Sequence, residues 1–160
     1  MCGIIGYIGP REASSLIYGG LKRLEYRGYD SSGIAVLNGD GIAVERAVGK
    51  LGNMDSKMGA LQAIYQAAAG QRQTGIGHTR WATHGGVTEN NAHPHLNIDG
   101  TIAVIQNGII ENFVEIKHEL QAEGVVFKSE TDTEVVPHLI DAFMRTGQGF
   151  EQAALSAIKQ

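Results

Sequence analysis

Cys2 is the residue of this chain that could most directly act as a nucleophile, because removal of Met1 would make it the N-terminal residue. An unperturbed thiol has a pKa near ~8.5 and an α-amine one near ~8, so the two groups can exchange a proton at neutral pH. The amine could take the proton of the thiol and later return it to a leaving group, with no histidine base. If Met1 stayed, the amine would be a non-basic amide and this chemistry would fail. The alternative interpretation is a small apolar side chain buried at the start of a strand.

Further positions carry the groups that such a nucleophile would need. Attack on an amide creates an oxyanion, and Asn107-Gly108 could stabilise it with a side-chain amide and a backbone N–H. Arg80 suits a carboxylate and Asp132 suits an ammonium group. Taken singly, an ordinary Asn-Gly turn, a surface ion pair or a helix cap would explain these residues as well. Together they match the outline of a small amino acid with a side-chain amide.

Four histidines within a short stretch raise the question of a metal: His78, His84, His93 and His95. Zinc sites show tighter pairings, and no cysteine or paired carboxylate accompanies these residues. We therefore expect structural hydrogen bonding, with no metal and no cofactor.

The elements that must position these residues follow from hydrophobic periodicity. The pattern predicts strands over 2–8, 33–38, 41–47, 74–79 and 101–106, and helices over 12–24, 56–69, 111–123, 132–146 and 150–158. The strands at 2–8 and 101–106 are apolar on both sides, so we expect them to be buried on both faces. Pro137 must lie near the first turn of its helix. Packed layers of this kind allow either a four-layer α/β/β/α sandwich or a three-layer α/β fold.

Composition places the chain among soluble globular proteins. It has 160 residues, 42% hydrophobic and 19% charged, with a net charge of −4. No clustered basic residues indicate nucleic-acid binding, and no apolar run approaches the ~18 residues that span a membrane. The N-terminus does not fit a signal peptide, and the single cysteine suits a reducing compartment. We expect a cytoplasmic protein of one domain.

Six segments together resemble the N-terminal-nucleophile (class II) glutamine amidotransferases. These segments are CGIIG, LEYRGYDSSG, GHTRWATHG, NAHPH, QNGIIEN and SETDTEV. More narrowly, they are similar to the glutaminase domains of the glutamine–fructose-6-phosphate aminotransferase (isomerising) family, also called glucosamine-6-phosphate synthases. The resemblance implies the α/β/β/α sandwich and hydrolysis of L-glutamine to glutamate and ammonia through a thioester.

The resemblance also implies a role for individual residues. Cys2 would be the nucleophile and, through its amine, the base, while Asn107 and the Gly108 N–H would form the oxyanion hole. Arg80 would bind the glutamine α-carboxylate and Asp132 the α-ammonium group. The remaining expected site residues surround the substrate or the Cys2 amine: Arg27, Gly28, Trp81, Thr83, His84 and His93.

The chain departs from the family pattern in two ways. Gln106 stands where the family commonly has histidine before the Asn-Gly pair. The chain is also shorter than family glutaminase domains, so we expect later strands and the sugar-isomerase half, which acts on fructose 6-phosphate, to be absent. Full-length family enzymes dimerise largely through that half. The alternatives to an active glutaminase are an inactive glutamine-binding or regulatory fragment, or the glutaminase domain of another class II enzyme.

Overall fold

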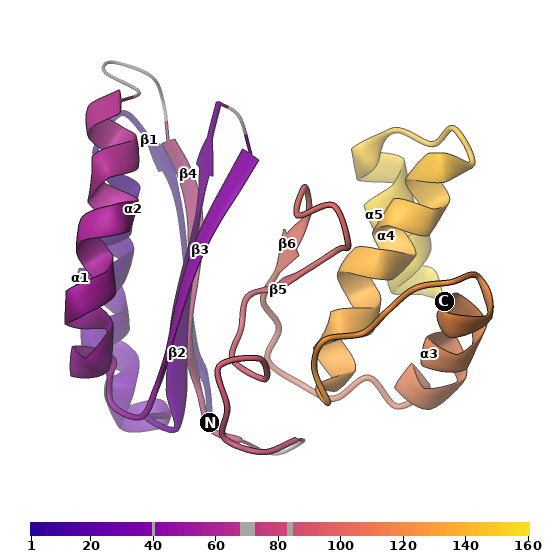
Figure 1. The fold of residues 1–160 in the computed structure, drawn as a ribbon, viewed down its shortest axis with the longest axis horizontal. Coiled ribbons are helices and arrows are strands. Elements are labelled where there is room, and N and C mark those ends of the chain that lie inside the picture. Colours follow the sequence, from indigo (N-terminus) through magenta and orange to yellow (C-terminus); the bar gives the residue numbers. More distant parts are fainter. Residues whose placement is uncertain (40, 68–72, 83–84) are drawn as a thin grey trace.

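The computed structural model describes residues 1–39, 41–67, 73–82 and 85–160, which form helices and strands in four successive layers (Figure 1). The strands are β1 (Gly3–Gly9), β2 (Ser31–Asn38), β3 (Gly41–Val48), β4 (Gln73–Arg80), β5 (His95–Leu96) and β6 (Ala103–Val104). The α-helices are α1 (Ala13–Leu24), α2 (Asp55–Ala67), α3 (Phe113–Ala122), α4 (Val135–Arg145) and α5 (Phe150–Lys159). Short 3₁₀ turns cover Glu25–Arg27, Leu51–Met54 and Asp132–Glu134.

The main sheet has four antiparallel strands in the order β1-β4-β2-β3. The predicted hairpin is present, because Asn38 pairs with Gly41 at the tip of β2 and β3. Asp40, in the turn itself, lies outside the described residues. Strand β4 lies between β1 and β2, so it has a hydrogen-bonded neighbour on each side.

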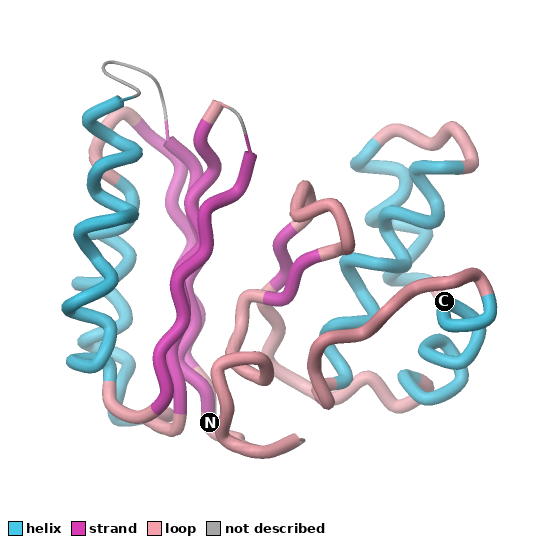
Figure 2. The backbone as a smooth tube through the Cα atoms, in the orientation of Figure 1, coloured by secondary structure: helices cyan, strands magenta, loops and turns pink. Residues whose placement is uncertain are grey.

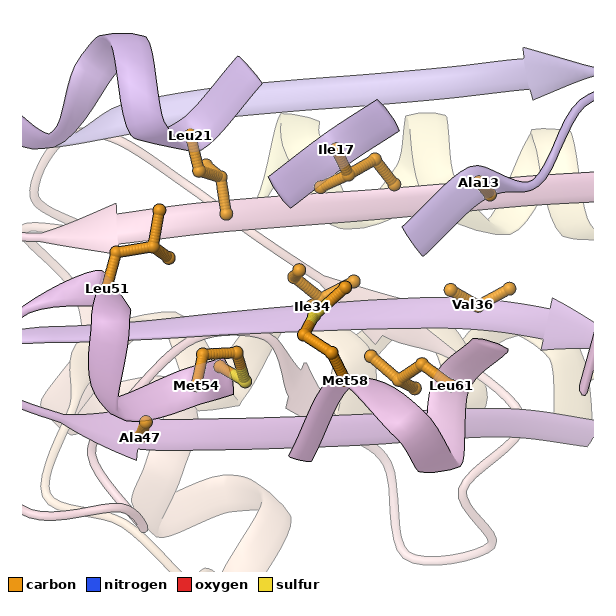
Figure 3. Packing of buried hydrophobic residues seen from close by; sticks show 10 residues of the cluster. All are labelled: Ala13, Ile17, Leu21, Ile34, Val36, Ala47, Leu51, Met54, Met58 and Leu61. Carbon is orange, nitrogen blue, oxygen red and sulfur yellow. The ribbon is translucent and has the colours of Figure 1, made fainter. Parts of the chain in front are cut away.

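Helices α1 and α2 cover one face of this sheet and enclose the main hydrophobic core (Figure 3). Ala13, Ile17 and Leu21 recur at the helical spacing and are completely buried against the sheet. From the strands, Ile34 and Val36 of β2 point into the same core. The predicted amphipathic helix at 12–24 is therefore confirmed, with its first residue at Ala13.

The other face of the sheet looks toward the short β5–β6 pair and then α4 and α5 (Figures 1 and 2). Helix α4 buries Leu139 and Ile140 in two small clusters that it shares with α3 and α5. Pro137 is the third residue of α4, where its missing N–H is tolerated as predicted. The layers thus follow the α/β/β/α order, with the second sheet reduced to two short strands.

Two expectations about the strands are wrong. The strand expected over 101–106 is regular only at Ala103–Val104, because β5, its one neighbour among the described residues, offers just two residues for pairing. Strand β1 is not buried on both faces, since Ile4 is 40% and Ile8 72% exposed on the side away from α1. No helix in the described ranges is long and apolar enough to cross a membrane.

Candidate active site

A pocket of about 420 Å³ opens where β1 begins and β4 ends. This volume lies within the range of sites that enclose a small ligand. Its lining comes from the N-terminus, from the end of β4 and from the loops around residues 106 and 132. The lining residues are Met1, Cys2, Arg27, Arg80, Trp81, His93, Gln106, Asn107, Gly108, Ile109, Thr131, Asp132 and Thr133.

The pairing of β1 with β4 places Cys2 in this pocket. Gly3 pairs with Thr79, so Cys2, one residue earlier, lies opposite Arg80, the last residue of β4, and its side chain reaches the next residue, Trp81. The Trp81 backbone N–H donates to the Cys2 Sγ at 3.2 Å, and Sγ lies 3.6 Å from the Trp81 carbonyl oxygen.

Gly28 allows the preceding turn to pass directly against the end of β4. A Cβ atom at this position would lie 2.7 Å from the Arg80 carbonyl carbon and 2.8 Å from the Trp81 nitrogen. Its neighbour Arg27 lines the pocket, and the Arg27 Nε donates to the Tyr26 hydroxyl at 3.1 Å. Any larger side chain than glycine at 28 would therefore push the pocket wall away from Cys2.

The Asn107 side chain bridges the nucleophile and the sheet. Its Nδ2 donates to the Cys2 carbonyl oxygen at 3.1 Å, and its Oδ1 lies 2.9 Å from the His78 Nε2. Gly108 follows with a φ of +148°, a conformation that side chains rarely adopt. Asn107 and Gly108 thus both line the pocket that contains Cys2, where an oxyanion-binding pair would lie.

Gln106 packs its amide against this pair. With the amide in the orientation that satisfies its neighbours, Oε1 accepts from the Gly108 N–H at 3.3 Å and Nε2 donates to Thr133 Oγ1 at 3.1 Å. Gln106 therefore supports the loop at 106–108 through contacts with Gly108 and Thr133.

Two opposite charges are held in the pocket. Arg80 is only 3% exposed and donates from Nη1 to the Gly86 carbonyl oxygen at 3.2 Å. Burial lowers the pKa of Arg80, while the nearby Cys2, Asp30 and Asp132 act in the opposite direction.

Asp132 is 5% exposed and accepts from the Ile110 N–H at 2.8 Å and the Thr133 N–H at 2.9 Å. A carboxylate has about four acceptor positions, so capacity remains for an ammonium group.

Three histidines stack behind the pocket. The ring of His93 lies 4.3 Å from that of His78 and 4.6 Å from that of His95. His93 Nε2 bonds Thr133 Oγ1 at 3.0 Å, and His95 Nε2 bonds Thr131 Oγ1 at 2.7 Å. Burial lowers the pKa of His78 to about 4 and that of His95 to about 3, and it also lowers the pKa of His93. The three rings are therefore neutral at pH 7 and hold the loop that carries Asp132.

No group of three or more metal-binding side chains occurs in the described part of the chain. The stacked rings direct their Nε2 atoms at Asn107, Thr133 and Thr131, not at a common point. Their contacts are hydrogen bonds to neighbouring side chains.

The structure brings most of the residues predicted from sequence into one pocket. Its lining includes Cys2, Arg27, Arg80, Trp81, His93, Asn107, Gly108 and Asp132. Gly28 does not line the pocket but supports its wall, and Thr83 and His84 lie outside the described residues.

Sequence reasoning missed other contributors. Gln106, Ile109, Thr131 and Thr133 also line the pocket. Asp30 accepts from the Ala82 N–H at 2.8 Å and so fixes the chain just after Trp81. His78 could have been found from strand alternation, because it lies two positions before Arg80 and therefore on the same face of β4.

Comparison with known proteins shows which family the chain resembles. A family model described as a glutamine amidotransferase domain matches residues 61–154. The chain is 52% identical over 158 residues to the glutamine–fructose-6-phosphate aminotransferase (isomerizing) of Gloeobacter violaceus, a match that covers 99% of this chain and 25% of the relative. It is 56% identical over 140 residues to the enzyme of the same name from Streptomyces coelicolor, covering 88% of this chain and 22% of the relative. The chain thus spans about a quarter of the length of the curated relatives it matches.

Two solved structures share the fold. One is a glutamine phosphoribosylpyrophosphate amidotransferase from B. subtilis complexed with ADP and GMP, with a TM-score of 0.74, 26% identity, and coverage of 99% of this chain and 32% of that chain. The other is described as the allosteric regulatory enzyme of purine biosynthesis, with a TM-score of 0.76, 27% identity, and coverage of 99% and 33%. These similarities confirm the fold class expected from the sequence, the α/β/β/α type of N-terminal-nucleophile amidotransferases.

Proposed function

The chain belongs to the glutamine amidotransferase domain family, and we propose that its pocket hydrolyses L-glutamine to glutamate and ammonia, with Cys2 as the nucleophile. One observation carries this proposal. The side chain of Asn107 bonds the backbone of Cys2 across 105 positions of sequence, in a pocket that also contains Arg80 and Asp132. A nucleophile, an oxyanion donor and two opposite charges are the groups that glutamine hydrolysis needs.

Binding uses the two charges. The guanidinium of Arg80 pairs with the α-carboxylate of glutamine, and Asp132 accepts from the α-ammonium group. Both partners are almost fully buried, so their interactions with the substrate act in a setting that water screens poorly. The side-chain amide of glutamine then extends toward Cys2 and Asn107.

Acyl transfer follows from the N-terminal cysteine once Met1 has been removed. The α-amine of Cys2 takes the thiol proton while sulfur attacks the amide carbon of glutamine. Negative charge develops on the amide oxygen, where Asn107 Nδ2 donates and where the Gly108 N–H donates in exchange for its long bond to Gln106 Oε1. The protonated amine then gives its proton to the departing nitrogen, ammonia leaves, and a thioester joins sulfur to the glutamyl group.

Hydrolysis of the thioester uses the same groups a second time. The amine of Cys2 takes a proton from a water molecule that attacks the thioester carbon. The same oxyanion donors stabilise the second tetrahedral intermediate. When it collapses, the carbon–sulfur bond breaks, the proton returns to sulfur, and glutamate is released.

Replacement of the nucleophile tests this mechanism. Glutamate and ammonia are measured from protein whose loss of Met1 has been verified by intact mass, for the original chain and for Cys2→Ala. Because the alanine variant retains an N-terminal amine but lacks sulfur, we expect it to release no glutamate above background while its melting temperature changes little. Alkylation with a glutamine-like electrophile should add one mass increment at Cys2 and stop turnover. Hydrolysis that persists in Cys2→Ala would refute the proposal.

Tight binding of glutamine without turnover in processed protein would instead favour a glutamine-binding or regulatory fragment. Isothermal titration with glutamine separates the two outcomes, because it reports binding whether or not the amide is cleaved.

The names of the relatives suggest the fate of the ammonia. We infer that it is transferred to fructose 6-phosphate on a sugar-isomerase segment, in a homodimeric enzyme of which this chain is the glutaminase domain. The test supplies glutamine and fructose 6-phosphate to this chain with and without a sugar-isomerase polypeptide of such a relative. Formation of the amino sugar only in the mixture would support the inference, and its absence beside intact glutaminase activity would contradict it.

A further inference from the structure

His78 occupies a position that the reaction itself does not require. Its side chain is completely buried on the same face of β4 as Arg80; its Nδ1 atom has no hydrogen-bond partner among the described residues, and the Gln106 backbone also interacts with the ring. Its Nε2 atom lies 2.9 Å from Asn107 Oδ1. The ring thus lies directly behind the side chain that we assign to the oxyanion hole.

The bond partners of Asn107 determine which atom of its amide faces His78. The group that donates to the Cys2 carbonyl oxygen at 3.1 Å must be the NH₂, because an oxygen cannot donate. The amide oxygen therefore faces His78, and the Nε2 of His78 must carry the hydrogen. Burial lowers the pKa of His78 to about 4, so the ring at pH 7 is neutral and protonated on Nε2 alone.

The neighbouring ring keeps this arrangement in place. His93 packs against His78 with ring centroids 4.3 Å apart and an interplanar angle of 31°. His93 is in turn bonded to Thr133, next to Asp132. The ring of His78 therefore has little freedom to turn away from Asn107.

The consequence concerns the second hydrogen of the Asn107 amide. One hydrogen of Nδ2 is used by the Cys2 carbonyl oxygen, and the other is available to an oxygen atom in the pocket. With Oδ1 held by His78, the plane of the amide is fixed from both ends. A donor to Oδ1 also polarises the amide and so strengthens donation from Nδ2.

We propose that His78 is a positioning residue, which donates from Nε2 to Asn107 Oδ1 and thereby directs the second Nδ2 hydrogen at the oxyanion formed during glutamine hydrolysis. The inference rests on the proposed function of this pocket. It adds that the oxyanion hole has a third member, which never touches the substrate.

Three substitutions test the proposal: His78→Gln, His78→Asn and His78→Leu. The amide nitrogen of glutamine can reach the place of Nε2, whereas that of asparagine reaches only the place of Nδ1, and leucine has no donor. Loss of an oxyanion donor lowers kcat by roughly 10²–10³-fold. For a residue that acts through Asn107 we expect about a 30-fold loss of kcat in Asn and Leu, near-normal kcat in Gln, and KM changed less than about threefold.

A second readout separates positioning from general structural damage. Glutamate γ-semialdehyde adds to a cysteine thiol as a hemithioacetal whose oxygen occupies the oxyanion position, whereas glutamate binds without such an adduct. In His78→Asn and His78→Leu we expect affinity for the aldehyde to fall in parallel with kcat and affinity for glutamate to stay unchanged. Both ligands are measured on the same folded sample, with its melting temperature recorded.

Three results would overturn the inference. They are full kcat in folded His78→Leu, an equal loss of affinity for aldehyde and glutamate, and failure of folded His78→Gln to recover kcat relative to His78→Asn. None of them bears on the glutaminase itself, which the Cys2→Ala comparison tests separately.

Discussion

Arg80 and Asp132 bring opposite charges into one pocket from two distant segments, and each is held by backbone groups before any ligand binds. Arg80 donates to the Gly86 carbonyl oxygen, and Asp132 accepts from the Ile110 and Thr133 N–H groups. Side chains fixed in this way lose little conformational entropy when a substrate arrives. Under the proposed function, the two charges together favour an α-amino acid over a simple amide.

Substitution of either charge should therefore impair glutamine binding. Truncating one partner of a buried charged pair costs about 2–5 kcal/mol, and each 1.4 kcal/mol is about tenfold. We expect Arg80→Lys and Asp132→Asn to raise KM for glutamine by about 100-fold, since lysine cannot offer the paired N–H groups and asparagine has no charge. Steady-state kinetics measures the change. The control is Arg145→Lys, at an exposed ion pair on α4, and an unchanged KM in both pocket variants would contradict the assignment.

The sequence predicted these residues because their chemical types together match a small amino acid with a side-chain amide, and because they lie in segments that resemble a known family. Cys2, Arg80, Asn107, Gly108 and Asp132 indeed share one pocket. The supporting residues were missed for a physical reason. Thr131 and Thr133 act by bonding His95 and His93, and such partners depend on the three-dimensional packing of distant segments.

At the scale of elements, the segment at 93–95 is fastened directly to the main sheet. It passes so close to β2 that a Cβ atom on Gly33 would lie 2.0 Å from the His93 carbonyl oxygen. From β3, Arg46 Nε donates to the Pro94 carbonyl oxygen at 3.0 Å. The histidine stack is thus positioned by the sheet at two points.

Gly33→Ala should push the segment at 93–95 away from β2. Overpacking of this kind costs roughly 3 kcal/mol, which lowers the melting temperature of a domain of this size by about 10 °C. Gly6→Ala on β1 is the matched control, because a Cβ there meets nothing within 4 Å. Thermal unfolding followed by circular dichroism compares the two variants, and equal melting temperatures would show that the 93–95 segment can shift without cost.

Strand length was the least predictable property of the elements. The pattern of 101–106 suits a buried strand, yet a ladder forms only where a neighbouring backbone is present, and β5 provides two residues. Helix α1 was predictable nearly to the residue because its burial depends on its own periodicity. For a strand, the decisive information lies in another part of the chain.

At the scale of the whole molecule, folding changes the charge state of several side chains. Burial lowers the pKa of His78 to about 4 and that of His95 to about 3. Arg80, which is near both rings, and Arg46, which is near His95, act in the same direction, whereas Glu134 acts in the opposite direction on His95. Burial would raise the pKa of Glu134, but the nearby His138 ring and the donors of Lys128 and Ser129 lower it to about 2. Each shift makes the folded state bind fewer protons in acid than the unfolded chain does.

Stability should consequently fall in acid in two stages. The histidines take up protons first in the unfolded chain, so the free energy of unfolding drops as pH falls from 6.5 toward 4. Below the ordinary glutamate value of 4.5, Glu134 adds to the loss until about pH 2. Urea unfolding at pH 7 and pH 4 measures the first stage. We expect the drop in the free energy of unfolding between pH 7 and pH 4 to be about 3 kcal/mol smaller in His95→Gln than in the original chain. In His118→Gln, which changes an exposed side chain, the drop should be no smaller. An identical fall in His95→Gln and the original chain would refute the assignment.

The contact between Cys2 and Asn107 also has a consequence for protein synthesis. A ribosome adds roughly 5–20 residues per second, so Cys2 is added to the chain roughly 7–26 s before Asp132. During that interval Cys2 is an ordinary thiol, because the groups that bind and polarise glutamine do not yet exist. Under the proposed function, the first site residue to be translated therefore cannot act before Asp132 has been added to the chain.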